Sequence, residues 1–240
     1  GEALAGMLAG MMRDDLCEIS FLHVRRAYHG CGVESRLIDE AVHFHRAGGA
    51  AGIVYECIPL CPLSVHDTFL DLGFEHVARE LMCTDARALA ERAGIARAVA
   101  PLAVADWPEA AACIVDAYHD HPGRRLHHEV RDIHHTTSFL HRVAEGRYGR
   151  VLDGGLLGIH GDGNCLGVVA CCEVAPQVGF VLQLAVRRAC QRQGLGHALL
   201  GAAAARFGLA GMGRVALGVT VNDPAHALYA RLGFVRLRPV

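Results

Sequence analysis

A glycine-containing loop near the C-terminal end of the chain has the residue types that bind a phosphate. It reads Gln191-x-x-Gly194-x-Gly196, follows an apolar strand-like run and opens a helix. The first backbone N–H groups of a helix have no partner within it, and the helix macrodipole favours negative charge at that end. Glycine at positions 194 and 196 removes Cβ atoms that would hold a phosphate away. The loop therefore predicts a phosphate or pyrophosphate site; a tight strand-to-helix turn is the alternative.

Two motifs in this region resemble the GNAT superfamily of N-acetyltransferases. The segment from Val186 to Gly196 is similar to the pattern V-x-P-x-x-(Q/R)-x-x-G-x-(G/A), with Arg188 at the position that is usually proline. Residues 222–234 are similar to the pattern N-x-x-A-x-x-x-Y-x-x-x-G-F. The resemblance covers residues 97–240 well and residues 1–84 as a partial copy.

The resemblance implies acetyl-CoA as the cosubstrate, and we expect no metal. Its pantetheine arm would lie between strands 178–186 and 214–221, which would splay apart and accept it as a surrogate strand. Asn222 would hold the pantetheine or the start of the final helix, for which Asp223 and Pro224 are a good cap. The implied cosubstrate-binding residues are Leu184, Ala185, Val186, Gln191, Arg192, Gln193, Gly194, Leu195, Gly196, His197, Asn222, Ala225 and Tyr229.

The resemblance also implies a catalytic role for Tyr229. When an amine attacks a thioester directly, charge builds on sulfur and a nearby phenol can donate a proton to it. A buried aromatic side chain that bridges helix and sheet is the alternative for Tyr229. The amine must also lose a proton, and Glu173 and Gln183 are the candidates for that step. Glu173 follows an apolar run, so a strand end that faces solvent is its alternative. We therefore expect an N-acetyltransferase that acts on a small-molecule amine or a peptide amine.

An internal repeat supplies the elements that must position these residues. Residues 24–27 (Val-Arg-Arg-Ala) recur at 186–189, and residues 72–74 (Leu-Gly-Phe) recur at 232–234. Each unit is expected to run as strand, glycine loop, amphipathic helix, strand and short helix. The expected fold is α/β (α+β), with two mixed, mostly antiparallel sheets flanked by helices, the N-terminal one incomplete.

The expected domains are a partial, degenerate lobe over 1–84, a helical connector over 85–96 and a complete domain over 97–240. Helices are expected at about 106–118, with Asp106 as the N-cap, and at about 125–145. The expected strands are 17–24, 52–58, 97–104, 148–153, 164–174, 178–186 and 214–221.

The first copy lacks the chemistry of the second. Alignment of the repeats pairs His29 with Gln191, Gly32 with Gly194, Glu34 with Gly196, Pro62 with Asn222 and Phe69 with Tyr229. A carboxylate at the mouth of a pyrophosphate site repels the ligand, and phenylalanine has no proton to give. We expect a structural or acceptor-side role for this lobe; an independent acyl-CoA site is the alternative.

Composition narrows the function classes. A net charge of -2 and a pI near 6.8 disfavour nucleic acid as a partner. Ten cysteines without regular spacing favour reduced thiols in a cytoplasmic protein, and the pair Cys57 and Cys61 has no second pair to complete a zinc site. No apolar run reaches the ~18 residues that a membrane span needs. A homodimer is compatible with the sequence.

Sixteen histidines raise the question of a metal. His127, His134 and His141 recur every seven residues, which places them on one helical face but about two turns apart, too far to share an ion. A polar helix face beside the acceptor cleft is the expectation. A mixed site drawn from His119, His121, His134 and His135 is the alternative.

Three rival functions remain. A catalytically inactive GNAT-like acyl-CoA sensor is compatible with the degenerate first copy, although Asn222 and Tyr229 favour turnover. A dinucleotide-dependent oxidoreductase would need a glycine-rich loop after the first strand and an acidic residue ~20 positions later, a pattern that is missing. A purely structural tandem protein would not need an anion-binding loop.

Overall fold

The computed structural model describes residues 4–13, 15–55, 63–94, 98–121, 124 and 127–237. The chain divides into two compact units between Val77 and Ala78. Each unit has its own sheet, and each is described by itself below.

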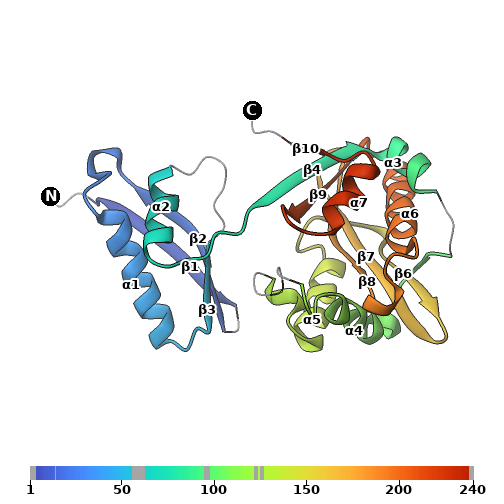
Figure 1. Cartoon of the computed structure of the whole chain (residues 1–240), viewed down its shortest axis with the longest axis horizontal. Coiled ribbons are helices and arrows are strands. Elements are labelled where there is room, and N and C mark those ends of the chain that lie inside the picture. Colours follow the sequence, from blue (N-terminus) through green and yellow to red (C-terminus); the bar gives the residue numbers. More distant parts are fainter. Residues whose placement is uncertain are drawn as a thin grey trace. The chain divides into compact units, whose positions relative to one another are not determined.

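The first unit is a three-stranded sheet with two helices (Figure 1). Strands β1 (Gly6–Arg13) and β2 (Leu16–Val24) pair antiparallel, and β3 (Gly52–Tyr55) pairs with β2 in parallel. Helix α1 (Val33–Ala47) connects β2 to β3, and α2 (Leu63–Asp71) follows. The alternation of strand side chains turns one face of β2 toward these helices. The buried core is Cys17, Ile19, Ile38, Val65 and Phe69.

The second unit is built on a seven-stranded sheet in the order β10-β4-β9-β8-β7-β6-β5. The strands are β4 (Arg79–Asp85), β5 (Ala100–Pro101), β6 (Arg150–Gly161), β7 (Asn164–Ala175), β8 (Val178–Val186), β9 (Arg214–Thr220) and β10 (Val235–Arg236). Only β8 and β9 pair in parallel; the other neighbours in this sheet are antiparallel. The prediction of mixed, mostly antiparallel sheets flanked by helices is confirmed.

Helices cover both faces of this second sheet, as Figure 1 shows. The helices are α3 (Ala86–Ala93), α4 (Trp107–Ala117), α5 (Ile133–Ala144), α6 (Leu195–Leu209) and α7 (Ala225–Arg231). On one face α4 and α5 pack around Ile114, Leu140 and Val168. On the other face α3 and α6 pack around Leu89 and Phe207. Short 3-10 turns occur at Arg26–Tyr28, Val104–Asp106, His128–Val130 and Arg188–Cys190.

The sequence repeat is also a structural repeat. In both units an antiparallel strand pair is followed by a glycine loop, a helix and a parallel strand. The residue before the helix, Gly32 in one unit and Gly194 in the other, is left-handed, with φ of 76° and 84°. The closing turns also match. The N–H of Phe74 donates to the carbonyl of Phe69, and the N–H of Phe234 donates to the carbonyl of Tyr229, each at 3.0 Å. The prediction of two related units is confirmed.

The boundary between the units differs from the one expected at residue 84. Strand β4 belongs to the second sheet, where it pairs with β9 on one side and β10 on the other. The expected connector 85–96 is helical over Ala86–Ala93, but it is a part of the second core, since Leu89 is fully buried. The compact second unit therefore begins before β4.

The helix expected over 125–145 is shorter. It starts at Ile133 because the Asp132 side chain accepts a hydrogen bond from the N–H of His135 at 2.9 Å and caps it. It ends before Gly146, whose φ is +75°. His127 lies before the helix, so His127, His134 and His141 do not form one helical face, and that expectation was wrong.

Two other expected elements are present. The helix expected over about 106–118 runs from Trp107 to Ala117 with Asp106 at the N-cap position, as predicted, but the Asp106 carboxylate accepts from the N–H of Ala103 at 2.8 Å and makes no capping bond to the helix. The strand expected at 97–104 is reduced to Ala100–Pro101. Residues 56–62, with Cys57, Cys61 and Pro62, lie outside the described part, as do Arg97 and Arg125.

Candidate functional site

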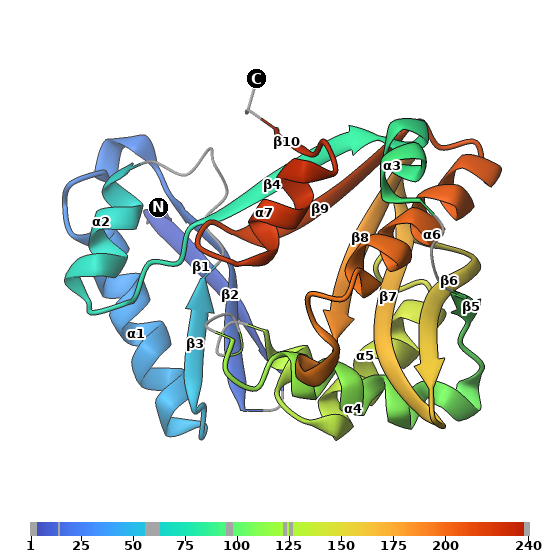
Figure 2. The same ribbon diagram turned by 45° about the vertical axis from the view of Figure 1, so that its right-hand side comes forward.

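A cavity of about 710 Å³ lies in the second unit where β8 and β9 diverge. The two strands pair only as far as Val181 and Leu217, although β8 continues to Val186 and β9 to Thr220. A bulge at Leu182, where the pairing of β7 with β8 skips one residue, lies where the divergence begins. Figure 2 shows the two strands separating from their paired ends. The free edge of β8 therefore faces the cavity and can hydrogen-bond an extended ligand.

The glycine loop forms one end of this cavity. Arg192 and Gly194 are both left-handed, with φ of +62° and +84°. The first helical bond of α6 that reaches back into the loop is donated by Ala198 to the carbonyl of Gly194, at 3.1 Å. The N–H groups of residues 195–197 precede that bond and point out of the helix end. Gln191 closes the loop, since its Nε2 donates to the carbonyl of Val186 at 3.1 Å.

The loop has the features of an anion site. A helix of this length presents unpaired N–H groups and the positive end of its dipole to an anion. At Gly196 an added Cβ would lie 3.3 Å from Cδ2 of Leu228, so α7 lies against the first turn of α6. A glycine there leaves the mouth of the site open.

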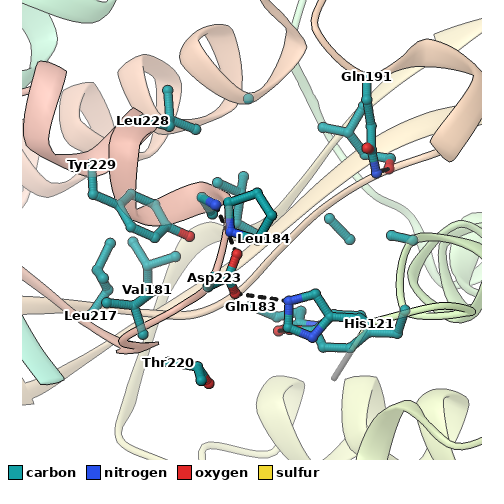
Figure 3. Close-up of a pocket in the computed structure, with 18 of the residues that line it drawn as sticks. His121, Val181, Gln183, Leu184, Gln191, Leu217, Thr220, Asp223, Leu228 and Tyr229 are labelled. Atoms are coloured by element: carbon teal, nitrogen blue, oxygen red, sulfur yellow. Dashed lines mark hydrogen bonds and ion pairs between the residues drawn. The ribbon is translucent and has the colours of Figure 1, made fainter. Parts of the chain in front are cut away.

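Tyr229 lies in the same cavity, on α7. Its side chain is 7% exposed and packs edge to face on Phe234, with ring centroids 5.7 Å apart. Figure 3 shows its hydroxyl turned toward the cavity. Burial raises the pKa of the Tyr229 phenol, and the nearby Tyr118 and Asp223 raise it further. The phenol is therefore neutral and can act as a proton donor.

Asp223 and His121 form a second polar feature of the cavity (Figure 3). Nε2 of His121 lies 2.8 Å from Oδ2 of Asp223, and their side chains are only 19% and 17% exposed. The other carboxylate oxygen accepts from the N–H of Ala225 at 2.7 Å, at the start of α7. Burial alone would raise the pKa of Asp223, but the hydrogen bonds from His121 and Ala225 lower it. Asp223 is thus an ionised carboxylate inside the cavity.

Tyr118 adds an aromatic wall next to this pair. Its hydroxyl donates to Oε1 of Gln183 at 3.2 Å, and its ring lies 4.9 Å from that of His121. Burial raises the pKa of Tyr118 to about 12. Nε2 of Gln183 is buried and has no hydrogen-bond partner among the described residues. A buried donor without an acceptor in a cavity wall is ready to bond a ligand.

His127 and Glu129 border the same region from the segment before α5. Nδ1 of His127 lies 3.4 Å from Oε1 of Glu129. Burial would raise the pKa of Glu129, but the contact with His127 lowers it, so this carboxylate is also ionised. Only His127 of the two lines the cavity itself.

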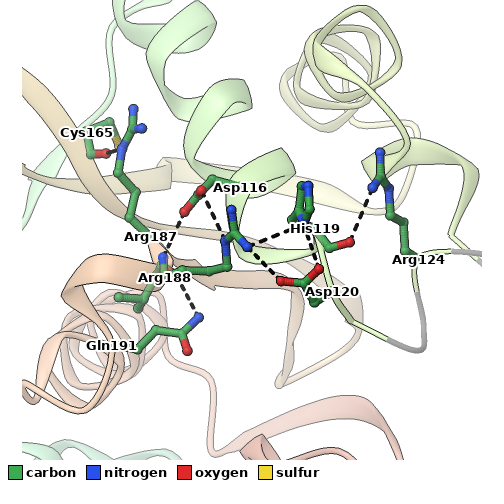
Figure 4. A network of polar contacts seen from close by, with 9 residues as sticks. Asp116, His119, Asp120, Arg124, Cys165, Arg187, Arg188 and Gln191 are labelled. Atoms are coloured by element: carbon green, nitrogen blue, oxygen red, sulfur yellow. Dashed lines mark hydrogen bonds and ion pairs between the residues drawn. The ribbon is translucent and has the colours of Figure 1, made fainter.

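Arg188, the residue at the usual proline position of the loop motif, joins the loop to α4 (Figure 4). Its backbone N–H donates to Oδ2 of Asp116 at 2.8 Å, and its guanidinium donates to Asp116 and to Asp120, the latter at 2.6 Å. The neighbouring Arg187 donates to the carbonyl of Cys165 and to Glu109. The Arg188 contacts hold the last turn of α4, and with it Tyr118, against the loop, whereas the Arg187 contacts reach β7 and the first turn of α4.

Most of the sequence-predicted residues line the cavity. These are Leu184, Ala185, Val186, Gln191, Arg192, Gly194, Leu195, Gly196, His197, Ala225 and Tyr229. Gln193 and Asn222 are exposed and are not among the lining residues. Glu173 also lies outside the cavity lining, near the other end of β7, and forms an ion pair with Arg150. The structure thus separates the expected base from the expected acid.

Sequence reasoning did not single out the residues on the other side of the cavity. It expected a histidine-bearing face beside an acceptor cleft and named His121 only within an alternative metal site. It did not choose Tyr118, and it considered Asp223 only as a helix cap. The pairs they form join residues 65 and 102 positions apart. A motif confined to one segment carries no signal for such pairs.

Within the described ranges, no group of three or more histidine, cysteine, aspartate or glutamate side chains is close enough to hold a metal ion. No helix in the described part of the chain is long and apolar enough to cross a membrane.

Comparisons with known proteins agree with this geometry. Residues 106–234 match the model of the acetyltransferase (GNAT) family. A GCN5-related N-acetyltransferase from Sphaerobacter thermophilus has a similar structure, with a TM-score of 0.67 at 15% identity over 97% of this chain and 74% of that one. A tandem GNAT protein from the clavulanic acid biosynthesis pathway gives 0.60 at 16% identity, over 97% and 76%. A GCN5-related N-acetyltransferase from Kribbella flavida gives 0.55 at 20% identity, over 98% and 84%. A search of curated proteins found no significant match.

Proposed function

Because the chain belongs to the acetyltransferase (GNAT) family, we propose that it transfers the acetyl group of acetyl-CoA to a primary amine by direct attack, with Tyr229 as the general acid. The observation that carries the proposal is the continuity of one cavity from the helix end at Gly196 to the Tyr229 hydroxyl. This cavity has an anion site at one end and a neutral proton donor deeper inside.

The free edge of β8 supports binding of the pantetheine arm. Residues 182–186 of β8 have no partner on β9, so their outward backbone groups can bond the amides of the arm as a further strand would. The N–H groups at the start of α6 would hold the pyrophosphate. In this arrangement the thioester would lie toward Tyr229 and the buried Nε2 of Gln183, both of which border the cavity.

The proposed reaction needs a proton for the leaving sulfur. The amine nitrogen forms a bond to the thioester carbonyl carbon, the C–S bond breaks, and the thiolate takes the phenolic proton of Tyr229. The phenolate then regains a proton from the acylated nitrogen. Burial keeps the Tyr229 phenol protonated in the free protein, so its proton is present when the thiolate departs.

The far side of the cavity supports a cationic acceptor. The rings of Tyr118, His121 and His127 and the carboxylate of Asp223 line it. An ammonium ion is attracted both to aromatic faces and to a carboxylate, whereas a neutral alcohol gains less from either. Arg79 also lines the cavity, and it would disfavour a second positive charge beside it.

The first unit supports a single cosubstrate site per chain. Its loop keeps the conformation of the second, with Gly30 and Gly32 left-handed where Arg192 and Gly194 are. However, Glu34 takes the place of Gly196, at the point where the pyrophosphate would lie. We therefore expect the first unit not to bind acetyl-CoA.

Calorimetric titration with acetyl-CoA and a thiol-release assay with a panel of primary amines test the proposal. We expect one site per chain, and Tyr229→Phe should bind acetyl-CoA normally while its turnover falls by ~10²- to 10⁴-fold. Tyr148→Phe is the matched control, since Tyr148 bonds Arg142 outside the cavity lining. Binding without release of thiol from any amine would instead identify an acyl-CoA sensor. Equal turnover of the wild type and Tyr229→Phe would remove Tyr229 from the mechanism.

A further inference from the structure

We propose that His121, oriented by Asp223, is the general base that takes a proton from the acceptor ammonium ion. The inference rests on the proposed acetyl transfer and adds the residue that makes the acceptor nucleophilic. A primary amine is mostly protonated near neutral pH, and an ammonium ion has no lone pair with which to attack. Glu173, the base expected from the sequence, lies outside the cavity lining, so another group must accept this proton.

The geometry of the pair suits a base. A carboxylate only accepts hydrogen bonds, so Nε2 of His121 must be the donor in its 2.8 Å contact with Asp223. In that tautomer the lone pair of the ring is on Nδ1, which is therefore the atom that accepts a proton. Once protonated, the imidazolium is stabilised by the carboxylate that it already contacts. Asp223 is itself held in place by the N–H of Ala225, at 2.7 Å.

Position supports the assignment as well. His121 and Tyr229 line the same cavity from different elements, and Asp223, which contacts His121, is close enough to raise the pKa of Tyr229. An acceptor bound between the two would meet the base on one side and the thioester on the other. In Figure 3 His121 and Tyr229 approach Asp223 from opposite sides.

Other charged and titratable groups also face this region. The turn after α4 contributes Asp120 and Tyr118, whose ring contacts that of His121. The segment before α5 contributes His127 and its partner Glu129, and β4 contributes Arg79. Among these groups, Asp223 makes the short contact with the His121 ring. The two other ionised carboxylates have partners of their own, Arg188 for Asp120 and His127 for Glu129.

The protons balance in this scheme. The acceptor ammonium gives one proton to Nδ1 of His121, and the neutral amine then attacks the thioester carbonyl. Tyr229 protonates the departing sulfur and is reprotonated by the second proton of the nitrogen. His121 releases the first proton to solvent. The net change is one amide formed, one free thiol and one proton released, with no oxidant or reductant needed.

Two acceptors of similar shape separate the role of the base from a structural role. Ethylamine is mostly an ammonium ion at neutral pH, whereas trifluoroethylamine is a much weaker base and is mostly neutral. We expect His121→Gln to lower kcat/KM by ~10²- to 10⁴-fold with ethylamine but by less than ~10-fold with trifluoroethylamine. Asp223→Asn, which can keep the bond to the N–H of Ala225, should show a smaller loss with the same dependence on the acceptor.

Further measurements make the result decisive. Free imidazole should restore part of the ethylamine rate of His121→Ala but none of that of Tyr229→Phe. His226→Gln is the matched control, because His226 contacts Glu80 and does not line the cavity, and it should leave both rates unchanged. Equal losses with the two amines, or no rescue by imidazole, would overturn the role of His121 and leave the proposed acetyl transfer intact. Absence of thiol release from both amines by the wild-type protein would overturn both.

Discussion

Replacement of Gly196 by glutamate offers the sharpest test of the anion site, because it should weaken the binding of coenzyme A and leave the free energy of unfolding nearly unchanged. A Cβ at this position would lie 3.3 Å from the end of the Leu228 side chain, which is flexible and can shift. Glutamate in the first turn of a helix gains about 0.3–1 kcal/mol from the macrodipole. We therefore expect Gly196→Glu to fold as stably as the wild type, within about 1 kcal/mol.

The binding of coenzyme A should respond very differently. If the new carboxylate lies ~5 Å from a pyrophosphate charge, the repulsion at an effective dielectric constant of about 20 is about 3 kcal/mol, or more than ~10²-fold in Kd. Gly196→Gln has nearly the same size without the charge, and Gly196→Ala reports the effect of the Cβ alone. The difference between the glutamate and glutamine variants therefore isolates the electrostatic contribution.

The assay is calorimetric titration with coenzyme A, next to thermal unfolding without ligand. The difference in affinity for coenzyme A between the glutamate and glutamine variants should become smaller at high salt, since exposed charges are screened. Equal affinity of those two variants would refute an anion site at the start of α6. A large loss of stability in the glutamate variant would refute the inference that this position is open.

Two further predictions concern the framework. Gly179→Ala should destabilise the second unit by about 1–3 kcal/mol in urea unfolding, because a Cβ there would overlap the ring of Phe207. Gly213→Ala is the control and should not destabilise it, because no atom lies near the added Cβ. Similar unfolding midpoints for the two variants would show that the core relaxes around the new methyl group. Asp132→Ala should lower the free energy of unfolding by about 1 kcal/mol in the same assay, because it removes the cap of α5. Asp132→Asn should retain most of that stability. Equal losses in the two variants would mean that the bond to the N–H of His135 is not the stabilising contact.

The structural repeat agrees with our proposal that the two related units differ in function. The backbone of the loop is conserved between them down to its left-handed residues, as is the closing contact of Phe69 with Phe74 and of Tyr229 with Phe234. What differs is side-chain chemistry at single positions, such as Glu34 in place of Gly196. The fold of the unit thus does not depend on the residues that we propose for binding and proton transfer.

The amino-acid sequence by itself determined the features that depend on neighbouring residues. The glycine loop, the helix that it opens and the position of Tyr229 before Gly233 and Phe234 are local patterns, and backbone sterics and helix periodicity turn them into the same local structure wherever they occur. The repeat was readable for the same reason. These local patterns were sufficient to predict the fold class and the two related units, and most of the site residues that they predicted line the cavity.

Only the tertiary structure decided which distant side chains meet. β4 pairs in the second sheet because its backbone finds partners on β9 and β10, a choice that no local pattern records. His121 reaches Asp223 across 102 residues, while Glu173 lies near the other end of β7 and pairs with Arg150. Pairings of this kind depend on the packing of whole helices against the sheet, so the proposed base emerges from the fold, whereas the proposed acid was already visible in the sequence.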